Sequence, residues 1–138
     1  MDSPVDRVMR LLNGYRFSQA VSVATRLGIP DLLADGPKSA GELASLTSTQ
    51  PGPLYQVLRA SASCGVFAED DSGRFSNTAM SECLRTGAPG PGRIAALLIG
   101  ETHFATFNEL MHSIRTGAPA FDKVFGQPFF DFLSANKQ

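Results

Sequence analysis

The stretch from Ser39 to Ser76 constrains the fold most, because it combines two helix patterns, a turn between them and a hairpin pattern. Ser39 and Glu42 have the spacing of a capping box, in which each side chain accepts a hydrogen bond from a backbone N–H of the first helical turn. A second apolar repeat follows the break at residues 50–53 and runs from Leu54 to Ala62. We therefore expect a short helix, a turn and a second helix.

A small hairpin is predicted after these helices. Residues 66–68 and 74–76 have strand-like composition, and they flank Asp70-Asp71-Ser72-Gly73, a loop rich in residues that tolerate hairpin turns. Two helices followed by such a hairpin are typical of a winged helix. The sequence therefore predicts a mainly α, winged-helix-like fold with a short acidic β-hairpin wing.

The bulk composition is that of one ordinary globular domain. The chain has 138 residues, 43% of them hydrophobic and 18% charged, and a net charge of −1. No global field steers it toward nucleic acid or an anionic membrane, and its longest apolar run, 94–99, is too short to span a bilayer. Cys64 and Cys83 have no metal or redox spacing, which favours a reduced, cytoplasmic location.

Long helices are expected on both sides of the winged-helix unit. Ser3 and Pro4 begin an N-terminal helix that carries one apolar stripe before Gly14 and a second after it, and both stripes need burial. Residues 34–38 form a linker into the winged-helix unit. Beyond the hairpin we expect a short helix within 77–84 and a loop at 85–92.

The C-terminal part is predicted as a helical lid with a phenylalanine-rich tail, about 93–134. Residues 93–99 and 102–115 have helix patterns that are separated or kinked at Gly100. Five of the ten phenylalanines then lie between 121 and 132. These rings either cover the core of this domain or pack on a second domain or second subunit, because large exposed apolar patches mark partner surfaces.

No constellation in the chain has the spacing of a catalytic or metal site. His103 and His112 are nine residues apart on one predicted helix, about 180° around it, so they cannot share an ion. The only GxG, at 90–92, follows no strand, and turn composition explains it better than nucleotide binding. We expect no catalytic, cofactor-binding or metal-binding residue here.

Binding to DNA is disfavoured by the charge of the winged-helix unit. Residues 39–76 contain two basic residues, Arg59 and Arg74, against four acidic ones, which leaves a net charge of −2. Affinity for a duplex rests on neutralising phosphates with Lys and Arg. An acidic wing would repel the backbone it should contact.

Four blocks of the chain resemble the N-terminal dimerisation domain of S-adenosylmethionine-dependent O-methyltransferases, with the bacterial branch that acts on aromatic polyketides nearest. The blocks are residues 24–33, 40–44, 54–67 and 113–121. This resemblance implies a homodimer formed through intertwined N-terminal helices and a lid over a small aromatic acceptor. It also implies that Ile99, His103, Phe104 and Phe107 contact that acceptor, although Phe107 stands where many members have tryptophan.

The Rossmann-type domain that follows in the family, with its S-adenosylmethionine site and catalytic histidine, has no counterpart in these 138 residues. We therefore expect a fragment, or an accessory subunit that works with a separate catalytic protein, and no activity of the chain alone. The leading hypothesis is the dimerisation and substrate-lid domain of an O-methyltransferase in antibiotic biosynthesis. The alternative from another class is a ligand-sensing winged-helix transcription regulator.

Overall fold

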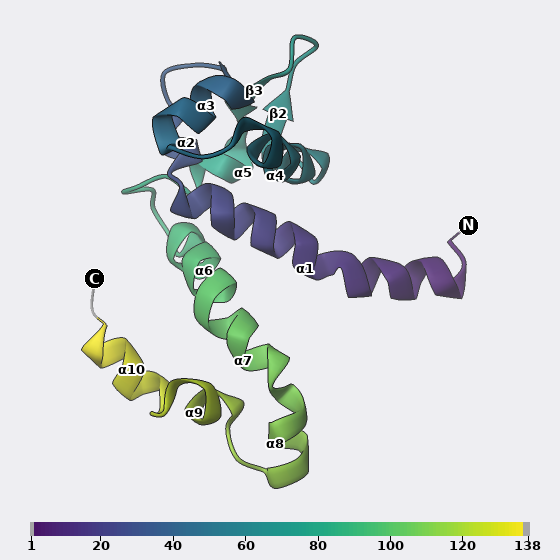
Figure 1. Cartoon of the computed structure of the whole chain (residues 1–138), viewed down its shortest axis with the longest axis vertical. Helices are drawn as coiled ribbons and strands as arrows, with labels where there is room; N and C mark the ends of the chain where they lie inside the picture. The colour runs from purple at the N-terminus through teal and green to yellow at the C-terminus, as the bar shows by residue number, and fades with distance from the viewer. Residues whose placement is uncertain (1, 137–138) are drawn as a thin grey trace. The chain divides into compact units, whose positions relative to one another are not determined.

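The structure, a computed structural model, describes residues 2–136, and these fall into two compact units that divide after Gly100. Figure 1 shows the chain from the long first helix to the C-terminal helices. The elements of the first unit are α1 (Pro4–Arg26), α2 (Ile29–Leu32), β1 (Lys38–Ser39), α3 (Ala40–Thr47), α4 (Pro51–Ser63), β2 (Phe67–Glu69), β3 (Arg74–Asn77), α5 (Ala79–Glu82) and α6 (Gly92–Leu98). The mainly α prediction with a small hairpin is confirmed.

A three-stranded antiparallel sheet and the helices α3 and α4 form the middle of the first unit. The strand order is β1-β3-β2, and Phe67 pairs with Asn77 across the predicted hairpin. The largest fully buried side chains there include Phe67, Phe75, Leu43 and Leu58. These side chains form a core between the sheet and the helices. The designation of this unit as a winged helix stays a prediction.

The predicted capping box at the start of α3 is present. Ser39 Oγ accepts a hydrogen bond from the Glu42 backbone N–H at 3.1 Å, and a Glu42 carboxylate oxygen accepts one from the Ser39 N–H at 2.7 Å. The linker prediction for residues 34–38 was wrong at its last residue. Lys38 starts β1, which pairs with β3 through Phe75, and a two-residue strand held only by its partner has no periodicity to detect.

The first helix is continuous through Gly14 and 23 residues long. A capping box of Ser3 and Asp6 and a proline at the first helical position begin it. It ends before Gly28, whose φ of 72° is the left-handed conformation that glycine adopts at little cost. A helix interior tolerates one glycine at a cost of about 1 kcal/mol, so Gly14 does not break α1.

The second unit consists of short helices. A π-helix, η1 (Ile99–His103), begins in the first unit and ends in the second. It is followed by α7 (Phe104–Asn108), α8 (Leu110–Thr116), α9 (Ala120–Phe125) and α10 (Phe129–Ala135). The prediction of one helix over 102–115 was therefore wrong. Glu109 lies between α7 and α8 with φ −101° and ψ 17°, which interrupts the helical hydrogen bonds. His103 and His112 consequently belong to different elements.

Candidate functional site

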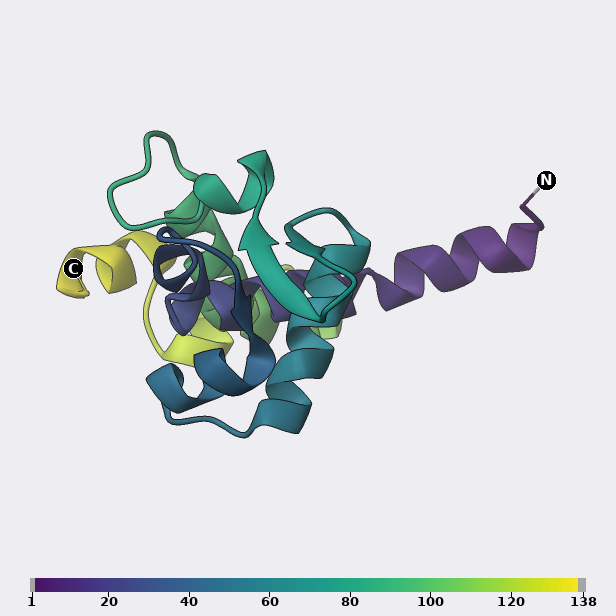
Figure 2. The same ribbon diagram turned by 90° about the horizontal axis from the view of Figure 1, so that it is seen from above.

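The N-terminal half of α1 carries an apolar surface that the first unit does not cover. In Figures 1 and 2 this half of the helix projects beyond the other elements of the unit. Leu11 and Leu12 are 82% and 64% exposed. We call this surface the α1 stripe, and its members, all exposed, are Val5, Val8, Met9, Leu11, Leu12 and Tyr15. The sequence predicted burial for the stripe of Val5, Val8, Met9 and Leu12, and the single chain leaves all four exposed.

The α1 stripe lies on the side of α1 opposite to Ala24 and Val21, which pack in or against the hydrophobic core. At 100° per residue, Ala24 is about 160° around the helix from Val8, and Val21 is about 180° from Leu12. Ala24 belongs to the hydrophobic core, and Val21 packs against that core. The stripe therefore faces away from Ala24 and Val21, on the arc of α1 that the buried Ser22 occupies in the C-terminal half.

The four predicted acceptor-contact residues are divided between the two units. Ile99 is in the first unit and is 45% exposed, whereas His103, Phe104 and Phe107 are in the second. His103 and Phe107 are four residues apart in helical conformation, so they share a helix face. Phe104 is 41% and Phe107 65% exposed. We call His103, Phe104 and Phe107 the candidate wall, because they offer two exposed aromatic rings beside an imidazole.

A cluster of phenylalanine rings from α9 and α10 lies next to His103. The His103 and Phe129 rings meet edge to face, with centroids 5.8 Å apart and planes at 78°. Phe121, 8% exposed, contacts Phe129 at 5.1 Å and stacks on Phe125 at 4.4 Å. The Phe130 ring touches Phe129 at 5.6 Å, so all five tail rings are connected by ring contacts, although Phe130 stays 77% exposed.

A charged contact ties α9 to the break between α7 and α8. Lys123 Nζ donates a hydrogen bond to a Glu109 carboxylate oxygen at 2.5 Å. This hydrogen bond and the charge of Lys123 lower the pKa of Glu109, so the carboxylate is ionised at neutral pH. Glu109 therefore anchors the tail at the residue that interrupts the predicted helix.

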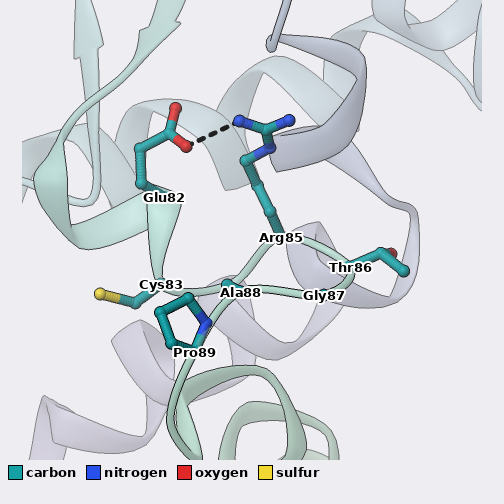
Figure 3. A pocket seen from close by; sticks show the side chains of 7 residues that line it. All are labelled: Glu82, Cys83, Arg85, Thr86, Gly87, Ala88 and Pro89. Atoms are coloured by element: carbon teal, nitrogen blue, oxygen red, sulfur yellow. Dashed lines mark hydrogen bonds and ion pairs between the residues drawn. The ribbon is translucent and has the colours of Figure 1, made fainter.

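One hollow in the first unit lies at the predicted loop 85–92. It has a volume of about 430 Å³, and its lining residues are Glu82, Cys83, Arg85, Thr86, Gly87, Ala88 and Pro89 (Figure 3). Arg85 points to Glu82, and their charged groups are 2.9 Å apart. Asp31 holds the loop by accepting hydrogen bonds from the Thr86 backbone N–H and hydroxyl, at 2.9 and 3.0 Å. None of the four predicted acceptor-contact residues lines this hollow.

One of the two basic residues of the winged-helix unit is engaged within the protein. Arg74 pairs with Glu42 at 3.0 Å and donates a hydrogen bond to the Pro37 carbonyl. At the wing tip, Asp70 accepts hydrogen bonds from Ser72 and from the Arg74 backbone N–H, which lower the pKa of Asp70. The tip is thus anionic at neutral pH.

Within residues 2–136, no three His, Cys, Asp or Glu side chains lie close enough together to hold a metal ion. In the same part of the chain, no helix has the length and apolar character needed to cross a membrane.

Comparison with known proteins gives the chain its family. The O-methyltransferase dimerisation domain matches residues 9–87, more than half of the sequence. The chain belongs to the O-methyltransferase dimerisation domain family. The match contains the second part of α1, the sheet and the helices α3 to α5. It also includes Met9, Leu11, Leu12 and Tyr15 of the α1 stripe.

Individual relatives agree with this family over nearly the whole chain. The phenazine O-methyltransferase PhzM of Lysobacter antibioticus is 37% identical over 131 residues, which are 95% of this chain and 38% of the relative. An 8-amino-8-demethylriboflavin N,N-dimethyltransferase of Streptomyces davaonensis is 36% identical over 127 residues, 87% of this chain and 37% of the relative. The crystal structure of LaPhzM superposes with a TM-score of 0.91, at 36% identity, over 98% of this chain and 41% of that one.

The chain spans about two fifths of the length of these relatives. The family match and the superposition establish the family and the fold of this part of the relatives. The family predicted from the four sequence blocks is confirmed.

Two features of the site were missed by sequence reasoning. The contact between His103 and Phe129 joins residues 26 positions apart, and no pattern in the sequence pairs them. Thr102 was not considered, although its hydroxyl lies 3.2 Å from His103 Nδ1. The adjacency of Thr102 and His103 in the sequence is the one signal that could have directed attention to this contact.

Proposed function

We propose that this chain is the dimerisation and acceptor-lid part of an S-adenosylmethionine-dependent methyltransferase that modifies an aromatic natural product. The observation that carries the proposal is the α1 stripe, an exposed apolar surface in a chain of the dimerisation domain family. The proposed partner is a second copy of the chain, which offers the same stripe. In a two-fold dimer each stripe residue is used twice, once from each protomer.

The size of the stripe is sufficient for a dimer interface. Full burial of one aliphatic side chain of this size stabilises by about 1.5–3 kcal/mol. Val5, Val8, Leu11 and Leu12 from two protomers therefore supply a gross gain on the order of 10–20 kcal/mol. Association costs about 4–15 kcal/mol in lost freedom of the two partners. The stripe is thus large enough to hold a dimer when most of it is buried.

The Leu12→Asp variant tests the dimer. Two leucines leave the interface in the variant, and two charges would have to be buried in their place, so we expect the dimer dissociation constant to rise on the order of 100-fold or more. Light scattering over a concentration series measures this change. Leu46→Asp is the matched control, because Leu46 on α3 is 57% exposed and lies outside the stripe. A wild-type chain that stays monomeric at tens of micromolar would refute the dimer.

The acceptor part of the proposal assigns Ile99, His103, Phe104 and Phe107 to contact with a flat aromatic substrate. Exposed aromatic rings support it, because they offer stacking surface, and the imidazole of His103 can hydrogen-bond a hydroxyl or carboxylate. The relatives named above act on phenazine and flavin compounds according to their names. By analogy the substrate class proposed for the whole enzyme is a planar aromatic hydroxy compound.

The methyl donor is proposed to bind outside this chain, in a catalytic domain or subunit that corresponds to the remaining three fifths of the relatives. Calorimetry of the chain with S-adenosylmethionine should give no binding isotherm, and a clear one-site isotherm would overturn this assignment. The free thiols Cys64 and Cys83 support a reducing, cytoplasmic setting. An electrophoretic shift of duplex DNA that weakens steeply with salt would instead favour a transcription regulator.

A further inference from the structure

The phenylalanine-rich tail contacts the candidate wall at His103. Phe129 of α10 meets the imidazole edge to face at 5.8 Å. This geometry is favourable for aromatic pairs, which prefer edge-to-face or offset arrangements. The tail is therefore placed to influence the one polar group of the candidate wall.

Phe129 is itself fixed by its neighbours in the second unit. Its ring meets Phe121 edge to face at 5.1 Å, and Phe121 is nearly buried. Phe121 also stacks on Phe125 and contacts Phe132, at 4.4 and 5.5 Å. A ring held by a packed cluster of this kind has few alternative rotamers. Phe129 thus provides a rigid surface for the imidazole.

A second contact restrains the imidazole at a ring nitrogen. Thr102 Oγ lies 3.2 Å from His103 Nδ1, within hydrogen-bond distance. The hydroxyl can donate to Nδ1 or accept from it, and each choice selects one tautomer of a neutral ring. The ring contact and the hydrogen bond together limit both the rotation of the imidazole and its tautomer.

We propose that Phe129 and Thr102 are positioning residues that hold His103 ready to hydrogen-bond the hydroxyl or carboxylate of an aromatic acceptor. This inference rests on the proposed acceptor-lid function. Its physical advantage is preorganisation, because a side chain already fixed in its bound conformation loses less entropy when the ligand binds. The function of the aromatic tail is then to shape the candidate wall.

The neighbouring Phe130 provides a matched control. It is on the same helix, has the same side chain and is 77% exposed. Its ring touches Phe129 at 5.6 Å. Phe130→Leu therefore removes an aromatic neighbour of Phe129 but leaves the ring that contacts His103, whereas Phe129→Leu removes that ring.

The histidine NMR spectrum tests the positioning. The chain has two histidines, and a His112→Gln variant assigns their resonances. In Phe129→Leu the ring current at His103 disappears, so its ring-proton resonances should shift while those of His112 stay. Phe130→Leu should leave both sets nearly in place. Phe129→Tyr keeps the ring, so its His103 resonances should match those of the wild-type chain. This variant keeps the test available if Phe129→Leu does not fold. His103 resonances that do not respond to Phe129→Leu, or a tyrosine variant that shifts them as strongly, would overturn the positioning.

Binding of alizarin, a planar dihydroxyanthraquinone, tests the link to the acceptor. Loss of one aromatic pair should weaken alizarin about two- to tenfold in Phe129→Leu relative to Phe130→Leu. Equal affinities in these two variants would overturn the acceptor role of Phe129. A wild-type chain that does not bind alizarin would count against the candidate wall itself, and the histidine spectrum would still decide whether Phe129 positions His103.

Discussion

Gly100 is a position at which one added methyl group should be strongly felt. A Cβ atom built on Gly100 would lie 1.7 Å from Ser22 Oγ and 2.3 Å from Ser22 Cβ. Ser22 is 1% exposed on α1, so its side chain cannot move into solvent. Rotation about its χ1 angle moves Oγ but leaves Cβ in place. Gly100→Ala therefore forces the two backbones apart.

The magnitude follows from two opposing terms. Overpacking a well-packed site costs about 1–3 kcal/mol, and a Cβ–Cβ approach this short corresponds to the upper end. Replacing a helical glycine by alanine returns up to about 1 kcal/mol. We expect a net loss of about 2 kcal/mol for Gly100→Ala. Gly14→Ala is the control, because nothing lies within 4 Å of a Cβ there, and it should gain up to about 1 kcal/mol.

Urea unfolding followed by circular dichroism measures both variants. The measurements use the Leu12→Asp background, which we expect to be monomeric, so that association does not enter the free energy of unfolding. Ser22→Gly combined with Gly100→Ala removes the clashing atoms and should return the stability to within about 1 kcal/mol of the parent. A Gly100→Ala variant as stable as Gly14→Ala, or a double variant without recovery, would refute the reasoning.

Two further predictions concern the first unit. Asp31→Asn should lower the free energy of unfolding by about 1–2 kcal/mol and speed amide hydrogen exchange in loop 85–92, because Asp31 accepts two hydrogen bonds from Thr86. Asp71→Asn at the wing tip is the control. Unchanged exchange in the Asp31 variant would contradict the role of Asp31. For Glu42, the hydrogen bond from the Ser39 N–H lowers the pKa, so its stabilising contribution is present at neutral pH and is lost as the pH falls below about 4. The urea midpoint of Glu42→Gln should therefore differ from that of the parent at neutral pH and converge with it in acid; a difference independent of pH would contradict the assignment.

The local elements of the first unit could be predicted because their signals are short-range. Ser39 and Glu42 form a capping box within one helical turn, and the hairpin around residues 70–73 is determined by turn residues next to two strands. β1 could not be predicted, because Lys38 is a strand residue only through its pairing with β3. The break at Glu109 was missed for a related reason, since the apolar spacing of 102–115 continues across it.

The sequence by itself determined the mainly helical fold and the presence of an apolar stripe before Gly14, since these depend on caps and periodicity. It also indicated the family, through four blocks of residues that resemble it. Only the tertiary structure decided that this stripe stays exposed in the single chain and that Phe129 meets His103. Both results depend on contacts between residues far apart in the chain. Such contacts follow from how the elements pack, and helical periodicity carries no information about that packing.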